Sequence, residues 1–319
     1  MMKAIICNEF GGVDKLSFID IDTPKIKEDE LLIKTAYCGV NFPDLLIVQG
    51  KYQYRPDFPF SPGQEVSGAV LQVGSKVEGF KEGDSVLASM TFGGYTEQAI
   101  AKAINVYHLP AEVPLDRAAT ILESFGTAMH ALKDRAMMKP GSTLLVLGAS
   151  GGTGSAAVQL GKRFGCRVIG VSSTDAKRAF VTSIGADYSL PYEDLKTAVK
   201  ALGGADVIFD PVGGTISEEA FRTINPYGKH LIVGFADGNI PALPFNLPLL
   251  KSADIVGVSW GGFWRSNPQE NRKNIKLILN WFAQEKLKSS VSEYALKDAL
   301  KAMRQLQERK SLGKIVLKV

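Results

Sequence analysis

One stretch near the middle of the chain, residues 144–160, constrains the fold more than any other. It reads Leu-Leu-Val-Leu-Gly-Ala-Ser-Gly-Gly-Thr-Gly-Ser-Ala-Ala-Val-Gln-Leu, so an apolar run leads directly into a cluster of glycines and then into a run with helical spacing. A buried strand, a glycine turn and a helix in this order are typical of a dinucleotide-binding fold, because glycines let backbone N–H groups approach a pyrophosphate. An ordinary glycine-rich turn is the alternative. It is disfavoured because a further strand follows at residues 167–171.

Strands and helices alternate on both sides of this loop, from residue 116 to residue 260. The strands are short and almost wholly apolar. Such alternation is typical of a parallel sheet whose two faces are covered by helices. We predict strands at 143–147, 167–171, 207–210, 230–235 and 255–260, and helices at 116–132, 155–164, 176–184 and 218–224.

The first third of the chain has a different pattern, in which short strands are separated by Gly and Pro turns. This spacing predicts an antiparallel sheet or partial barrel with few helices. The chain ends in another strand, 314–319, after two amphipathic helices around Ile275 and Leu296. A parallel sheet does not need that strand, so we expect it to return to the first sheet. The other predicted strands are 3–7, 31–40, 66–74, 84–89, 95–101 and 106–109.

Charge and cysteine content exclude several classes of protein. Lys and Arg number 37 against 33 Asp and Glu, and a net charge of +4 gives no reason to expect a nucleic-acid partner. Cys7, Cys38 and Cys166 are scattered without a C-x-x-C pair, which argues against disulfides and against a four-cysteine zinc site. No secretion signal and no run of about 20 apolar residues is present. The sequence therefore predicts a soluble protein of the cytoplasm.

The end of the strand after the glycine loop discriminates between NAD and NADP. In NAD-binding proteins an acidic residue at this point accepts a hydrogen bond from the ribose 2′-OH. Here the strand ends in the hydroxyls of Ser172 and Ser173, and Lys177 and Arg178 follow within a turn. Hydroxyls and cations suit a 2′-phosphate, so we predict NADPH. The alternative, that Lys177 and Arg178 are only the solvated face of a helix, stays open, and Asp175 adds a carboxylate there.

Several motifs are spread along the whole chain. They are Gly39-Val-Asn-Phe-Pro-Asp44, Gln49-Gly-Lys-Tyr52, Pro59-Phe-Ser-Pro-Gly-Gln-Glu65, Gly83-Asp-Ser-Val86, Gly93-Gly-Tyr-Thr-Glu97, Thr127-Ala128, the glycine loop, Asp210-Pro-Val-Gly-Gly214 and Gly313-Lys-Ile-Val-Leu317. In these motifs the chain resembles the medium-chain dehydrogenase/reductase superfamily, specifically its zinc-independent quinone oxidoreductase branch.

The resemblance implies an α/β fold of two domains with an active site in the cleft. A doubly wound Rossmann domain covers residues 123–262. A GroES-like, mainly antiparallel catalytic domain is formed by residues 1–122 and 263–319. The resemblance also implies that Ser173, Lys177 and Tyr192 contact the adenosine 2′-phosphate, and we expect Thr127 at the nicotinamide end. The residues assigned to the cofactor are Thr127, Gly148, Ser150, Gly151, Gly152, Thr153, Gly154, Ser172, Ser173, Lys177, Tyr192, Gly234 and Phe235.

The zinc chemistry of the superfamily is not expected here. Zinc relatives carry a Cys where this chain has Asn41 and a His where it has Gln64, and neither amide suits zinc. The lobe that holds four structural cysteines is also missing. The three histidines lie near no carboxylate pattern that suggests a metal site or a triad, and we predict structural or solvated roles for His108, His130 and His230.

Without a metal, hydrogen-bond donors must polarise the substrate carbonyl while hydride leaves the nicotinamide. Asn41, Tyr52 and Gln64 are the candidate donors, and Asp44 is expected to orient its neighbours. A conjugated carbonyl spreads the incoming charge over its π system, so neutral donors suffice. Tyr52 is also a candidate proton donor, by similarity to the Gly-x-Tyr of enoyl-thioester reductases. The alternative, that it only lines the pocket, stays open.

The sequence therefore predicts an oxidoreductase that transfers hydride from NADPH to a quinone or another α,β-unsaturated carbonyl compound. Quinone reductases often carry Tyr and Arg where this chain has Leu46 and Val48, which keeps enals and enones beside quinones. An NADPH-dependent enoyl-thioester reductase is the alternative enzyme. A nucleotide-binding protein without turnover is disfavoured because Asn41, Tyr52 and Thr127 are intact. As in related dimers, we expect the apolar stretch 255–264 to pair with its copy, giving a homodimer or a dimer of dimers.

Overall fold

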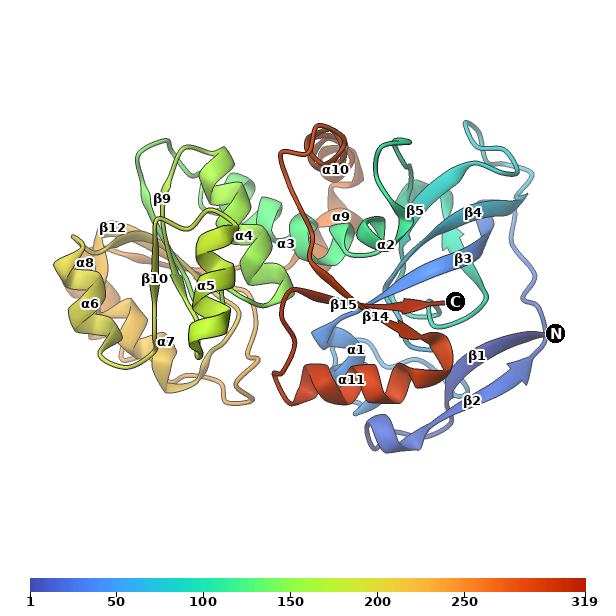
Figure 1. Ribbon diagram of the computed structural model, residues 1–319, viewed down its shortest axis with the longest axis horizontal. Coiled ribbons are helices and arrows are strands. Elements are labelled where there is room, and N and C mark those ends of the chain that lie inside the picture. The colour runs from blue at the N-terminus through green and yellow to red at the C-terminus, as the bar shows by residue number, and fades with distance from the viewer. The chain divides into compact units, whose positions relative to one another are not determined.

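The computed structural model describes residues 1–319 and divides them into two compact units (Figure 1). The first contains Met1–Glu123 and Ile278–Val319, and the second contains Ser124–Leu277. The chain thus returns to the first unit at residue 278, not at the predicted residue 263. The reason is that the first part of helix α10 (Pro268–Ala283) is bonded to the second unit. There Asn271 accepts a hydrogen bond from Trp260 at 2.8 Å, and Asn274 donates to Asp134 at 3.0 Å.

A seven-stranded sheet forms the centre of the first unit. Its strands, in spatial order, are β14 (Val291–Ala295), β15 (Lys314–Lys318), β3 (Glu30–Val40), β4 (Glu65–Val73), β5 (Ser85–Ser89) and β7 (Val106–His108), with β6 (Gln98–Lys102) paired to β3. All pairs are antiparallel except β14 with β15. Strand β15 places Ile315 opposite Val40, which confirms the predicted return of the C-terminal strand to this sheet.

A two-stranded sheet completes the strands of the first unit. It pairs β1 (Met2–Cys7), predicted at 3–7, with β2 (Leu16–Ile21), which the sequence had not predicted. The strand predicted at 95–101 begins only at Gln98, because Tyr95 turns into the core, where it is fully buried. The helices of this unit are η1 (Val13–Lys15), α1 (Phe42–Val48), η2 (Ala103–Asn105), α2 (Leu115–Ala118), η5 (Leu296–Asp298) and α11 (Ala299–Gln307).

The second unit is built on a six-stranded, wholly parallel sheet. Its order is β10 (Tyr188–Leu190), β9 (Arg167–Val171), β8 (Thr143–Val146), β11 (Ala205–Asp210), β12 (Ile224–Ile232) and β13 (Asp254–Gly257). The chain winds outward from β8 in both directions, so right-handed crossovers put helices on both faces. This is the predicted doubly wound fold, although β10, α6 and α8 were not predicted.

The helices of the second unit lie on the two sides of this sheet, with α4 and α5 on one side and α6, α7 and α8 on the other (Figure 1). Their bounds are α4 (Gly152–Arg163), α5 (Asp175–Ser183), α6 (Leu195–Ala201), α7 (Gly214–Phe221), α8 (Asn246–Lys251) and α9 (Trp260–Ser266). None of the helices in the chain has the length and apolarity that crossing a membrane requires.

The helix predicted at 116–132 is interrupted. Helix α2 ends at Ala118 and is followed by the π-helical turn η3 (Leu122–Gly126), the short α3 (Thr127–Met129) and a second π-helical segment, η4 (His130–Arg135). The backbone N–H of Glu123 donates to the Glu65 carboxylate at 3.0 Å instead of to a carbonyl of the preceding turn. A side chain that captures a helical N–H in this way breaks the hydrogen-bond ladder, and π-helical turns are frequent at functional sites.

Candidate active site

Gly148 begins a tight turn after β8 in the second unit. Its φ of +59° lies in the left-handed region that favours glycine. The N–H of Ala149 donates to Val171 at 3.0 Å, which links the loop to β9. Gly151 is the N-cap of α4, and the first N–H groups of that helix, Gly152 to Gly154, have no preceding carbonyl to bond. The turn therefore offers the backbone donors and the helix N-terminus that a pyrophosphate requires.

Two glycines of this loop serve different purposes. A Cβ on Gly154 would lie 2.2 Å from the Gly148 carbonyl oxygen and 3.0 Å from the Ala149 Cα, so only glycine allows the helix to approach the turn. A Cβ on Gly151 would meet nothing closer than the Gly148 oxygen at 3.4 Å. A Cβ at Gly151 would therefore make only one contact, at an ordinary distance, so no protein atom crowds this side of the loop.

The end of β9 carries a buried hydroxyl without a hydrogen-bond partner. Ser172 is 1% exposed, its N–H donates to Leu190 at 3.0 Å, and its Oγ bonds to nothing in residues 1–319. An unsatisfied buried polar atom is costly, and three other side chains share this feature with Ser172: Thr35, Ser189 and His230. Ser173 is exposed, and Lys177 lies half-buried in the first turn of α5, which Thr174 caps. These residues fit the ribose 2′-phosphate of NADPH.

The other residues assigned to the cofactor also belong to the second unit. The Tyr192 hydroxyl accepts a hydrogen bond from the Gly148 N–H at 3.1 Å, which places it at the base of the loop. Gly234 and Phe235 follow β12, and the Gly234 N–H donates to Asp210 at 3.3 Å. The remaining three lie on the loop, on α4 and at the start of α3, which packs against α4: Ser150, Thr153 and Thr127.

Two histidines of the second unit are paired with carboxylates, which the sequence pattern had not indicated. His130 lies 3.0 Å from Asp134, and His230 Nε2 lies 3.0 Å from Asp210 Oδ2. Ser217 Oγ also donates to Asp210, at 2.6 Å, and is 3.5 Å from the His230 ring. Burial raises the pKa of Asp210, but the His230 and Ser217 hydrogen bonds outweigh it and the net pKa is lowered. Asp210 thus holds both side chains itself, in a core position where no substrate enters.

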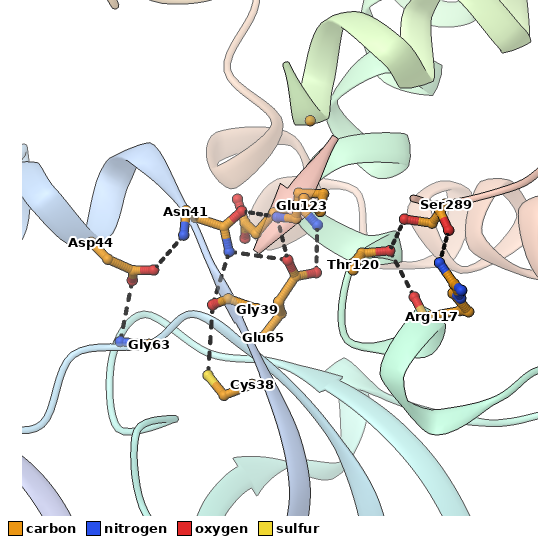
Figure 2. Close-up of polar contacts among 12 residues, drawn as sticks. Cys38, Gly39, Asn41, Asp44, Gly63, Glu65, Arg117, Thr120, Glu123 and Ser289 are labelled. Atoms are coloured by element: carbon orange, nitrogen blue, oxygen red, sulfur yellow. Dashed lines mark hydrogen bonds and ion pairs between the residues drawn. The ribbon is translucent and has the colours of Figure 1, made fainter. Parts of the chain in front are cut away.

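In the first unit, a buried ion pair lies where the sequence predicted a carbonyl-polarising donor (Figure 2). Lys314 Nζ lies 2.9 Å from Glu65 Oε1, and it also donates to the Asn41 Oδ1. Asn41 Nδ2 donates to Glu65 Oε1 at 3.0 Å and to the Gly39 carbonyl at 3.4 Å. Glu65 Oε2 accepts the Glu123 N–H at 3.0 Å. We name Asn41, Glu65, Glu123 and Lys314 the Glu65 cluster. Both amide hydrogens of Asn41 are thus engaged, one by Glu65 and the other by the Gly39 carbonyl.

A glycine makes room for the Glu65 cluster. A Cβ on Gly39 would lie 2.2 Å from the Ala119 carbonyl oxygen and 2.4 Å from Glu65 Oε1. The side chains of Glu65 and Lys314 are 1% and 7% exposed, so the pair is shielded from water. Loss of one partner of such a pair strongly destabilises the fold, because the remaining charge stays buried without a counter-charge.

Asp44 holds the loops around this cluster together. Its carboxylate accepts hydrogen bonds from the Asn41 N–H at 2.8 Å, the Gly63 N–H at 3.2 Å and the Tyr95 hydroxyl at 3.0 Å. Burial raises the Asp44 pKa from 3.8 to about 7, although the hydrogen bonds of Asn41 and Tyr95 oppose the rise. The side chain is therefore a positioning group that has no exposed oxygen for a substrate.

The raised pKa of Asp44 predicts a pH-dependent stability. Because the folded chain keeps the proton after the unfolded chain has lost it, the contribution of this group is complete below pH 3.8 and declines as the pH rises toward about 7. Over that window Asp44→Asn should show a shallower fall in the free energy of unfolding than the wild type, by on the order of a few kcal/mol. Urea titrations at a series of pH values measure this, with the exposed Asp57→Asn as control. Equal slopes in all three proteins would contradict it.

The other two predicted donors are Gln64, which directly precedes Glu65, and Tyr52, which follows α1. Gln64 is 4% exposed and donates one amide hydrogen to the Thr91 carbonyl at 3.3 Å, which leaves its second hydrogen for a substrate. Tyr52 is half-buried and packs against the core of the first unit.

Comparison with known proteins places this architecture in a family. The family model described as an alcohol dehydrogenase GroES-like domain matches residues 27–111, and the one described as a zinc-binding dehydrogenase matches residues 152–280. A quinone oxidoreductase-like protein 2 homolog of Nematostella vectensis is 36% identical over 328 residues, covering 99% of this chain and 88% of that protein. The chain belongs to the medium-chain dehydrogenase/reductase superfamily. Within it, the chain falls in the quinone oxidoreductase-like branch.

Solved structures of this superfamily share the fold over the full chain. A mycobacterial protein in complex with NADPH has a TM-score of 0.94 at 30% identity and covers 100% of both chains. An Escherichia coli quinone oxidoreductase, also in complex with NADPH, has a TM-score of 0.94 at 26% identity over 99% of this chain and 100% of the other.

The name of one matching family model implies zinc. The side chains of this chain do not fit a zinc ion. In residues 1–319 no group of three His, Cys, Asp or Glu side chains is arranged to hold a metal. The ammonium group of Lys314 donates to the Asn41 oxygen and forms an ion pair with the Glu65 carboxylate, so both of these oxygen ligands are already bound to a cation. A second cation there would be repelled, and we derive no catalytic step through a metal.

Three polar residues of this site, Glu65, Glu123 and Lys314, were not among the predicted site residues. Glu123 stands in an apolar run that is typical of an ordinary helix, and only the fold brings its backbone N–H to the Glu65 carboxylate. The only indication in the sequence is a charged residue at a position where the helical pattern places buried side chains.

Proposed function

We propose that this protein is an oxidoreductase that transfers hydride from NADPH to a quinone or another α,β-unsaturated carbonyl compound, without zinc. The glycine turn before α4 carries the proposal, because the N–H groups of Gly152 to Gly154 at the helix N-terminus can bind a pyrophosphate. The two relatives solved with NADPH support the choice of coenzyme. The quinone oxidoreductase-like relatives support the class of substrate.

The residues of the chain divide the chemistry between coenzyme binding and substrate polarisation. NADPH, when bound, supplies the hydride. The loop Gly151 to Gly154 binds the pyrophosphate through its N–H groups, and Ser172 and Lys177 hold the 2′-phosphate. The free amide hydrogen of Gln64 and the hydroxyl of Tyr52 polarise the substrate carbonyl. Asn41 and Asp44 keep these groups in position.

A panel of acceptors tests the proposed reaction. Oxidation of NADPH should be fast with quinones, enals and enones, and slow with isolated ketones, because only conjugated acceptors spread the charge over a π system. Enoyl thioesters belong in the same panel, since they separate the proposed activity from that of an enoyl-thioester reductase. Turnover of isolated ketones alone, or of no acceptor, would overturn the proposal.

Lys177→Ala should separate NADPH from NADH. Loss of one charge-assisted hydrogen bond to a phosphate costs about 1.5–3 kcal/mol, which corresponds to a roughly 10- to 100-fold weaker NADPH affinity. Affinity for NADH should change less than about threefold by the same reasoning. Fluorescence titrations with both coenzymes measure the two Kd values, and the exposed Lys196→Ala serves as control. A similar loss for both coenzymes would remove Lys177 from the phosphate site.

We further propose that the protein forms a homodimer through strand β13. This strand is at the edge of the sheet and pairs only with β12, and Ile255 on it is 43% exposed. An apolar edge strand readily pairs with another copy. Ile255→Lys should shift the protein to a monomer in light-scattering measurements. A monomeric wild type would contradict the proposal.

A further inference from the structure

The carboxyl group of Glu123 has no partner, although it lies beside a buried ion pair. Within residues 1–319 its side chain makes no hydrogen bond and no ion pair, while its own backbone N–H is bonded to Glu65 at 3.0 Å (Figure 2). The side chain is half-buried and belongs to the π-helical turn η3. Every other polar member of the Glu65 cluster is hydrogen-bonded within the cluster. Glu123 is thus the member left available to a ligand.

The surroundings decide which carboxyl of the cluster carries the negative charge. Glu65, on β4, receives Lys314, Asn41 and the Glu123 N–H, so its charge is compensated by three donors. Burial and the charge of Glu65 raise the pKa of Glu123 well above 4.5, and Asp44 on α1 adds to the rise, while Lys314 on β15 opposes it. Burial and the neighbouring carboxylate therefore favour the protonated form of Glu123, beside the Lys314–Glu65 ion pair.

Two acids near Asn41 have a raised pKa, Asp44 and Glu123, but Asp44 is fully buried, so Glu123 is the one that can reach a substrate. Amides such as those of Asn41 and Gln64 donate hydrogen bonds but do not lose the proton, and the reference pKa of a tyrosine hydroxyl is about 10. A general acid is most effective when its pKa lies near the working pH, and burial is the usual way to raise a glutamate into that range.

We propose that Glu123 is the catalytic acid that protonates the reduced substrate, an inference that rests on the proposed function. As the β-carbon of the substrate gains hydride and a new C–H bond, the π electrons move to the carbonyl oxygen. The O–H bond of Glu123 then breaks, and its proton neutralises the resulting enolate. The products are NADP⁺ and the reduced, neutral substrate. The Glu123 carboxylate regains its proton from water, so one proton and one hydride are consumed in each turnover.

Infrared difference spectroscopy tests the protonation state without any need for turnover. Glu123→Gln has nearly the same size and removes the acid. The wild-type protein minus this variant should show the carbonyl stretch of a neutral carboxyl at neutral pH, shifted in D₂O, and the exposed Glu112→Gln should show none. If the difference shows only a carboxylate band, Glu123 is ionised and the proposal is overturned.

The pH profile of enone reduction tests the role in catalysis. Wild-type kcat should fall as the pH rises through the pKa of Glu123, because the acid is lost. Glu123→Gln should lower kcat by roughly 100- to 10,000-fold at neutral pH and remove this dependence, with the Kd for NADPH unchanged. Glu123→Asp, which keeps the acid, should recover part of the rate and the falling limb, and it serves if the amide variant does not fold. Glu112→Gln should behave as wild type.

The outcomes separate the two proposals. A wild-type protein that reduces no conjugated carbonyl overturns the proposed function, and the inference with it. An active wild type together with a Glu123→Gln variant of equal rate and equal pH profile overturns the inference alone. If Tyr52→Phe removes the falling limb and Glu123→Gln does not, the proton comes from Tyr52.

Discussion

Lys314→Met should lower the free energy of unfolding by about 3–5 kcal/mol, the largest stability effect expected for a single side chain in the first unit. The methionine fills a similar volume, but Glu65, with 1% of its side chain exposed, keeps a charge that no ammonium group compensates. The Asn41 oxygen also loses the donor that fixes its orientation. Thermal denaturation should show a decrease in Tm on the order of 10 °C.

Two further variants test whether the ion pair causes this effect. Lys318 lies on the same strand, but it is 58% exposed and 3.6 Å from its partner Glu293. Lys318→Met should therefore lower the free energy of unfolding by at most about 1 kcal/mol. In the double variant Lys314→Met with Glu65→Gln, no charge remains buried, so it should be more stable than Lys314→Met alone. If Lys314→Met and Lys318→Met have the same free energy of unfolding, the buried ion pair does not stabilise the first unit.

Gly154→Val should abolish tight coenzyme binding, with a loss of affinity on the order of 100-fold or more. The new Cβ would lie 2.2 Å from the carbonyl oxygen of Gly148, and neither backbone segment can move without displacing the turn or the start of α4. The N–H groups that bind the pyrophosphate then lose their common direction. Calorimetric titration with NADPH measures the loss.

A glycine elsewhere in the same unit provides the matched control for Gly154→Val. Gly261 lies in α9, and a Cβ there would meet only the Arg265 guanidinium at 3.7 Å, an ordinary contact. Gly261→Ala should therefore bind NADPH as the wild type does. Normal NADPH affinity in Gly154→Val would mean that the loop is not the coenzyme site.

The fold of the second unit was predictable because its evidence is local in the sequence. The apolar strand before Gly148, the glycines after it and the hydroxyls at Ser172 and Ser173 lie within one continuous stretch, and each has a direct physical reading. The C-terminal strand around Ile315 was predictable for a related reason, since it had no place in a parallel sheet. Its confirmed pairing with β3 follows from this argument.

The polar site of the first unit was not predictable in the same way, because its contacts join distant segments. Lys314 meets Glu65 and Asn41 only after the chain has returned from the second unit. The sequence therefore showed Asn41 as a free donor, whereas both its amide hydrogens are engaged. The π-helical turn at Glu123 also escaped prediction, because helical periodicity does not reveal that a side chain from β4 captures a backbone N–H.

A crystal structure of the protein grown with a saturating concentration of NADPH tests the central claim most directly. The pyrophosphate should lie on the N–H groups of Gly151 to Gly154, with the 2′-phosphate against Ser172 and Lys177. A coenzyme bound elsewhere, or a glycine loop that stays empty under these conditions, would contradict the account.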